Sequence, residues 1–148
     1  MKKLFLVILF FVTFDCVLAQ ETFLPFKLGD SKEFVLRQIK EKLKSKHAFG
    51  DTNETTYKNG YIFKHKIDFI GVRFTNNKLY FISLMAYPFK TYIDSHEKIL
   101  TLLKKEHGIS TNHSYKWDSL SDSWDSGDKS INFICSEKYI SLVMSKKH

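Results

Sequence analysis

The chain contains one pattern twice, and this duplication constrains its fold more than any other feature. The first copy, Asp-Ser-x-Glu-x-Val-Leu-x-x-Ile-Lys, spans residues 30–40, and the second, Asp-Ser-x-Glu-x-Ile-Leu-x-x-Leu-Lys, spans residues 94–104. In both copies a helix-capping residue precedes apolar residues at helical spacing, and aromatic-rich alternating segments follow. Capping and packing explain every shared position. The duplication therefore predicts an architecture and no chemistry.

Both copies predict a helix. In the first, Asp30 or Ser31 is expected to cap a helix that runs to about residue 44, with Glu33 placed to close a capping box. The second helix is expected over about residues 92–107, because a glycine follows directly. Apolar residues cover one side of each helix, so each should pack that side on a core.

Alternation at period two predicts strands after each helix. The alternating groups are Tyr61/Phe63/His65, Ile70/Val72/Phe74, Tyr80/Ile82/Leu84, Ile131/Phe133/Cys135 and Ile140/Leu142/Met144. The pair Asn76-Asn77 tolerates left-handed backbone and predicts a tight hairpin turn. Residues 46–58 and the Ser/Asp-rich stretch at 117–128 lack such alternation and are expected to be loops.

The order of these elements predicts an α+β fold, a tandem α-β-β-β repeat with a mainly antiparallel sheet and two helices on one face. Residues 20–148 are long enough for a single domain, with repeat halves at about 26–87 and 88–148.

The first residues predict export. Lys2 and Lys3 precede an apolar run that ends at Phe14, and Ala19 supplies a small residue for cleavage. We expect a signal peptide over residues 1–19 and a secreted or periplasmic protein. A lipid anchor at Cys16 and an uncleaved anchor are the alternatives. No later apolar stretch is long enough to predict a transmembrane segment in the mature chain.

Removal of the signal would leave Cys135 as the one cysteine of the mature chain. It alternates in phase with Ile131 and Phe133, which predicts a buried thiol. The full chain has a formal net charge of +7. This charge leaves a basic binder of anionic polymer or membrane surface open as an alternative function.

Residues 28–35, Leu-Gly-Asp-Ser-Lys-Glu-Phe-Val, resemble the Gly-x-Ser/Thr-x-Glu-x-Val helix start of small exported bacterial domains. These domains are of the β-lactamase inhibitory protein and outer-membrane assembly lipoprotein type, and the former is a tandem α/β repeat with an open concave sheet. The resemblance implies a non-catalytic binding module in the cell envelope or outside the cell. The chain departs from the pattern, because it lacks a lipid-anchor cysteine and a disulfide in either half. No functional residue carries over.

With both helices on one sheet face, the other face is left free to bind. We expect it to present Arg73, Phe81 and Tyr139, with Trp117 and Trp124 as anchors at its rim. Aromatic residues and arginine are enriched where interfaces gain most of their binding energy. The predicted function is an exported, non-catalytic module that engages a protein or another envelope macromolecule, and no nucleic acid is expected.

Motifs for catalysis are missing. The chain has no Gly-x-Ser-x-Gly, no His-Glu-x-x-His and no glycine-rich phosphate loop, so no reaction is favoured. The enzyme alternative is an acid–base pair of His65 with a carboxylate of residues 118–128. No cofactor is expected, and no metal either, because Trp124 interrupts the oxygen spacing that a calcium loop needs.

Overall fold

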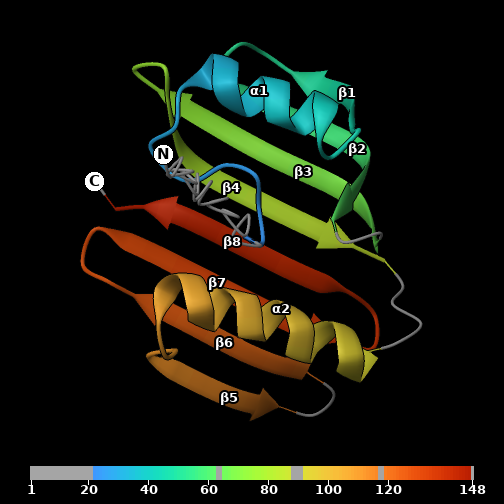
Figure 1. Cartoon of the computed structure of the whole chain (residues 1–148), viewed down its shortest axis with the longest axis vertical. Coiled ribbons are helices and arrows are strands. Elements are labelled where there is room, and N and C mark those ends of the chain that lie inside the picture. Colours follow the sequence, from blue (N-terminus) through green and yellow to red (C-terminus); the bar gives the residue numbers. More distant parts are fainter. Residues whose placement is uncertain (1–21, 63–64, 88–91, 117–118, 148) are drawn as a thin grey trace, which may run out of the picture.

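The computed structural model describes residues 22–62, 65–87, 92–116 and 119–147. The expected signal peptide and Trp117 lie outside these ranges. In chain order the elements are α1 (Lys32–Glu41), β1 (Lys46–Gly50), β2 (Glu54–Ile62), β3 (His65–Thr75), β4 (Lys78–Ala86), α2 (Tyr92–His107), β5 (Asn112–Lys116), β6 (Ser119–Asp125), β7 (Lys129–Ser136) and β8 (Ile140–Lys146) (Figure 1). This content confirms the expected α+β class.

The strands form one antiparallel sheet in the order β1-β2-β3-β4-β8-β7-β6-β5. Each half of the chain is a helix followed by a meander of four strands. The last strands of the two meanders, β4 and β8, pair at the centre, with Ile82 opposite Met144 and Leu84 opposite Leu142. One continuous sheet therefore joins the two halves.

Each half has four strands where three were expected, because two stretches expected to be loops are strands. Residues 46–58 contain β1 and the start of β2, and β6 lies within the Ser/Asp-rich stretch, paired with β5. These strands lie at or near the sheet edges and carry mostly polar side chains. In β1, Ala48 is half-buried and the other four residues are exposed. An edge strand of this kind does not need the apolar alternation by which strands are recognised.

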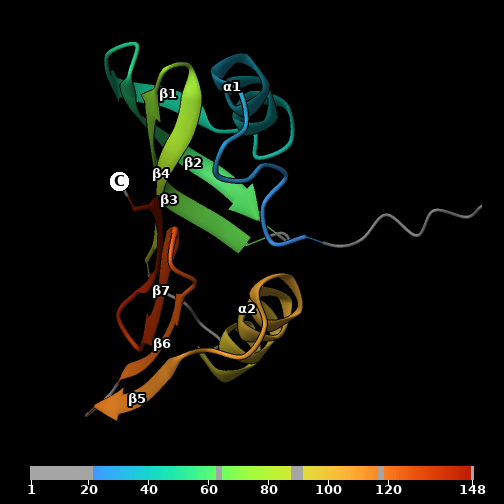
Figure 2. The same cartoon turned by 90° about the vertical axis from the view of Figure 1, so that its left-hand side faces the viewer.

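Both helices lie on the same side of the sheet, as Figure 2 shows with the sheet nearly edge-on. Helix α1 contacts β4, and α2 contacts β7. Val35, Ile39 and Leu103 on these helices are fully buried. Most alternating apolar positions of the expected strands are buried too, among them Val72, Ile82, Phe133 and Leu142, whereas Tyr61 is exposed and Tyr80 half-buried. The core thus fills the space between the helices and one face of the sheet.

The segment that precedes α1 belongs to this core. It runs between α1 and α2 on the helix side of the sheet (Figure 2). Phe23, Leu24 and Phe26 are buried there at 4–6% exposure. The Gly29 amide donates a hydrogen bond to the Leu79 carbonyl at 2.7 Å, which fixes the segment to β4. No periodic pattern in the sequence predicts this role, because the segment is irregular.

Helix α1 begins differently from the expected capping box. Ser31 is the cap, and its Oγ accepts a hydrogen bond from the Phe34 amide at 3.4 Å. With this cap, Glu33 lies one position too early to reach back to it. Glu33 instead accepts a hydrogen bond from Asn77 Nδ2 at 3.3 Å.

The expected bounds of α2 are confirmed. Gly108 follows the helix with a φ of 82°, and its amide donates to the Lys104 carbonyl at 2.8 Å. The turn at Asn76-Asn77 is also confirmed, since both residues are left-handed, with φ of 50° and 61°. Neither helix of the described residues has the length and apolar character to cross a bilayer.

Candidate binding surface

The side of the sheet opposite the helices is here called the open face (Figure 2). It carries the side chains that alternate with the core residues. On β1 to β4 and just after β4, its large apolar members include Phe49, Phe69, Phe81, Met85 and Tyr87. Phe49 is 59% exposed, Phe69 37% and Tyr87 46%. Large apolar side chains gathered on one exposed face are typical of an interaction site.

Two cations lie over aromatic rings on this face. The Arg73 guanidinium carbon lies 4.8 Å from the centroid of Phe81, which is its cross-strand neighbour. Arg73 also forms an ion pair of 2.7 Å with Glu54 on the other side. Lys58 Nζ lies 5.8 Å from the centroid of Phe69. The contacts with Phe81 and Glu54 hold the Arg73 guanidinium in place, while 43% of the side chain stays exposed.

The predicted residue Tyr139 lies apart from Arg73 and Phe81. Its ring is 6.4 Å from that of Tyr87, whose hydroxyl contacts the Met85 sulfur. Met85 is four residues further along β4 than Phe81, about 13 Å at strand spacing. The structure thus brings Arg73 and Phe81 together and places Tyr139 in a second aromatic cluster.

The other half of the open face is rich in hydroxyl groups, and the sequence pattern revealed them only on β7 and β8. The outward positions on β6, β7 and β8 include Ser121, Ser123, Ser130, Asn132, Ser141 and Ser145. Ile134 and Val143 are half-buried among them. The hydroxyl groups of β6 could be predicted only by recognising that β6 is a strand, because its register with β7 decides which side chains face outward.

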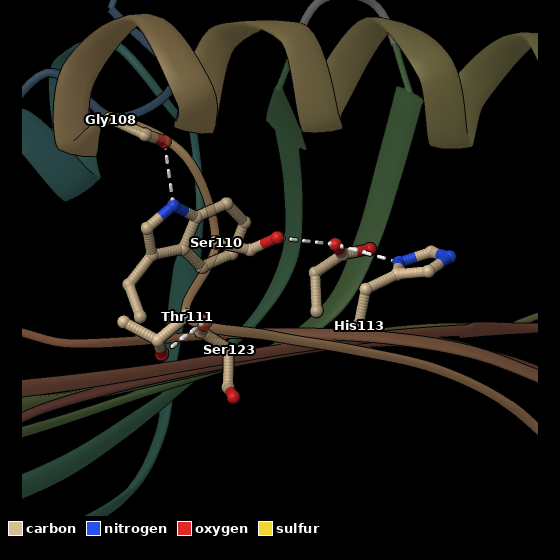
Figure 3. Close-up of polar contacts among 7 residues, drawn as sticks. Gly108, Ser110, Thr111, His113 and Ser123 are labelled. Carbon is tan, nitrogen blue, oxygen red and sulfur yellow. Dashed lines mark hydrogen bonds and ion pairs between the residues drawn. The ribbon is translucent and has the colours of Figure 1, made fainter.

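Trp124 is not an anchor at the rim. Its side chain is 3% exposed, because it alternates onto the helix side of β6 and pairs with Ile131. The indole Nε1–H donates a hydrogen bond to the Gly108 carbonyl at 2.8 Å (Figure 3). Trp124 therefore ties the end of α2 to the sheet.

The strand order separates the backbone of His65 from the β6 carboxylates of the enzyme alternative. His65 begins β3, which is separated from β6 by β4, β8 and β7. Four strand spacings amount to about 19 Å, beyond the reach of a histidine and an aspartate. The strand order therefore does not bring His65 together with Asp122 or Asp125.

A different histidine meets Asp122. His113 on β5 lies directly opposite Asp122, and its Nδ1 is 2.9 Å from Asp122 Oδ1. Ser110 Oγ donates to the same oxygen at 3.0 Å (Figure 3). The Asp122 side chain is 1% exposed, and that of His113 is 56% exposed. Predicting this pair required the β5 strand, which the polar sequence concealed.

This cluster has the wrong order for nucleophilic catalysis. A serine nucleophile needs a histidine that takes its proton, with the carboxylate behind the histidine. Here the carboxylate lies between Ser110 and His113, so the arrangement is not that of a Ser-His-Asp triad. The cluster instead fastens the loop after α2 to β6.

Other chemistry is sparse in the ranges that the structure describes. They contain no group of three or more His, Cys, Asp or Glu side chains placed to hold a metal ion. The expected burial of Cys135 is confirmed at 0% exposure, and this burial raises the pKa of its thiol to about 11. Such a thiol stays protonated at neutral pH.

Comparison of the chain with models of known protein families, with curated protein sequences and with solved structures finds no match.

Proposed function

We propose that this protein is an exported, non-catalytic module that binds another protein through its open face. The observation that carries the proposal is the ordered aromatic surface on a side of the sheet without a helix. Arg73 and Phe81 lie at its centre, and Phe49 and Phe69 extend it toward β1.

The composition of the open face favours a protein partner. Rigid aromatic side chains give contact area at low entropic cost, and serine and asparagine give adaptable hydrogen bonds, as in antibody paratopes. The face joins both kinds, with aromatics on β1 to β4 and hydroxyl groups on β6 to β8. Except for the edge strand β1, the strands that carry these groups are paired on both sides, so the groups are already held in place and lose little conformational entropy on binding.

Charge indicates an acidic patch on the partner. Arg73 and Lys66 are paired with Glu54 and Asp68. Lys46 and Lys58 are opposite each other on β1 and β2, and both are exposed. A complementary acidic surface near these lysines would speed association.

Two further expectations belong to this proposal. The two halves are copies of one α-β unit, as the doubled helix start suggests. Residues 1–19 direct export to the periplasm or the medium, where the partner is found. The resemblance at residues 28–35 implies the same class of function.

The test is affinity capture from the native medium or cell-envelope extract, with bound proteins quantified by mass spectrometry. The variant Phe81→Ala should lose one defined partner, and Arg73→Ala should weaken its capture. Tyr115→Ala is the matched control, because Tyr115 is a 67% exposed aromatic on the helix side of β5. Circular dichroism should show that all three variants remain folded.

Salt separates this proposal from the alternative of a basic binder of anionic surfaces. Capture through the aromatic face should persist when ionic strength is raised. Capture that survives Phe81→Ala but disappears in salt would show that charge alone holds the ligand. Retention of the partner by Phe81→Ala at all salt concentrations would contradict the proposal.

A further inference from the structure

A cavity of about 620 Å³ lies on the helix side of the sheet, away from the open face. Its walls come from the segment before α1, the start of α1, the last turn of α2, and strands β7 and β8. Small-molecule sites typically measure roughly 300–1,000 Å³. The cavity is therefore large enough for a small ligand.

Most of the cavity wall is apolar. It is formed by Leu24, Phe26, Leu28, Phe34, Ile131 and Met144. Leu24, Phe26, Ile131 and Met144 are buried at 4–6% exposure. These side chains come from four separate parts of the chain, so the folded protein alone creates this surface. It suits an aliphatic group.

Lysines from three elements also line the cavity. Lys27 precedes α1, Lys105 is in the last turn of α2, and Lys129 begins β7. Within the described residues, none of the three has a carboxylate at ion-pair distance. The cavity thus offers cations to a ligand.

The two carboxylates of the lining are already engaged. Glu106 accepts a hydrogen bond from the Phe23 amide, and its other oxygen is 3.6 Å from His107 Nε2. Asp30 accepts from the Lys27 amide at 2.8 Å. The net charge of the lining is positive, even with His107 neutral. An aliphatic tail with one anionic head complements such a site in both shape and charge.

We infer that this cavity binds a fatty acid of medium chain length, with its tail on the apolar wall and its carboxylate at Lys105 and Lys129. This inference does not depend on the function proposed for the open face, because the cavity and the open face lie on opposite sides of the sheet.

The first test follows the methionine methyl groups of the purified protein by NMR during titration with dodecanoate below its micelle concentration. Met144 lines the cavity, whereas Met85 is on the open face and serves as an internal control. The Met144 signal should shift in a saturable manner, and the Met85 signal should not move. The variants Met144→Leu and Met85→Leu assign the signals.

The second test concerns the carboxylate. The combined variant Lys105→Gln, Lys129→Gln should bind dodecanoate about tenfold more weakly and leave dodecanol binding unchanged. Lys104→Gln is the matched control, because Lys104 is an exposed neighbour that does not line the cavity. If the double variant fails to fold, the affinities of the native protein for dodecanoate and dodecanol are compared instead. The inference predicts tighter binding of dodecanoate.

Three results would overturn the inference. They are the lack of any saturable shift of Met144, a shift of Met85 in its place, and equal affinity of the native protein for dodecanol and dodecanoate.

Discussion

The guanidinium of Arg73 lies 4.8 Å from the ring of Phe81, its cross-strand neighbour on β4. The same guanidinium forms an ion pair with Glu54 on β2, so three neighbouring strands contribute to one ordered group on the open face. A charged side chain stacked on an aromatic ring keeps its shape in the absence of a ligand. This part of the open face is thus ordered in the absence of a ligand.

Truncation of the apolar helix positions should destabilise the protein strongly. Ile39→Ala and Leu103→Ala remove fully buried side chains, and each should lower the free energy of unfolding by about 2–5 kcal/mol. Lys40→Ala and Lys104→Ala, at exposed neighbouring positions, should stay near 0.5 kcal/mol. Denaturant midpoints measure the difference. Similar midpoints for buried and exposed variants would show that the apolar stripes do not carry the core.

Loss of the Asp122 carboxylate should detach the loop after α2. Asp122→Ala removes the acceptor for Ser110 and the partner of His113, and should cost about 1–3 kcal/mol. Hydrogen exchange should rise at residues 108–113 before the rest of the chain. Asp125→Ala, on the same strand but exposed, should leave exchange there unchanged. Unchanged exchange in Asp122→Ala would contradict this role of the cluster.

The pKa of His107 predicts a loss of stability in mild acid. Burial lowers this pKa from its ordinary value of 6.5, with Lys129 adding to the shift and Glu106 opposing it. The unfolded chain therefore takes up the proton first, so stability is full above pH 6.5 and falls as pH drops below it. His107→Gln should flatten the pH dependence of the unfolding midpoint between pH 7 and pH 5. An identical pH dependence in this variant would refute the contribution of His107.

The Cys135 thiol should resist alkylation in the folded protein. Its pKa of about 11 leaves little thiolate at pH 8, and its side chain is buried. In a Cys16→Ser background, iodoacetamide should label Cys135 slowly in buffer and quickly in denaturant. Equal labelling rates under both conditions would mean that the thiol is accessible.

The parts of the fold that follow from local patterns could be predicted from the sequence. The stripe of α2, the glycine after it and the Asn76-Asn77 turn each depend on a few neighbouring residues. The strands β1, β5 and β6 could not be found in this way, because their mostly polar residues lack the apolar alternation by which strands are recognised. The segment at residues 22–31 also escaped, since its burial depends on both halves of the sheet.

The same distinction applies to the candidate sites. Alternation along β3 and β4 was enough to propose Arg73 and Phe81 for one face, and these two residues are cross-strand neighbours. Trp124 was placed on the wrong face because β6 was not recognised as a strand. Without that strand, the face to which each of its side chains points could not be predicted. The contact of His113 with Asp122 depends on the register of two strands that the polar sequence conceals.

The most direct test of the central claim is site-specific photo-crosslinking in the native medium or envelope extract. A benzophenone side chain replaces either Phe81 on the open face or the exposed aromatic Tyr115 on the helix side of β5. The proposed function predicts a covalent adduct with one defined protein from position 81 and none from position 115. An adduct from position 115 alone, or none from either position, would contradict it.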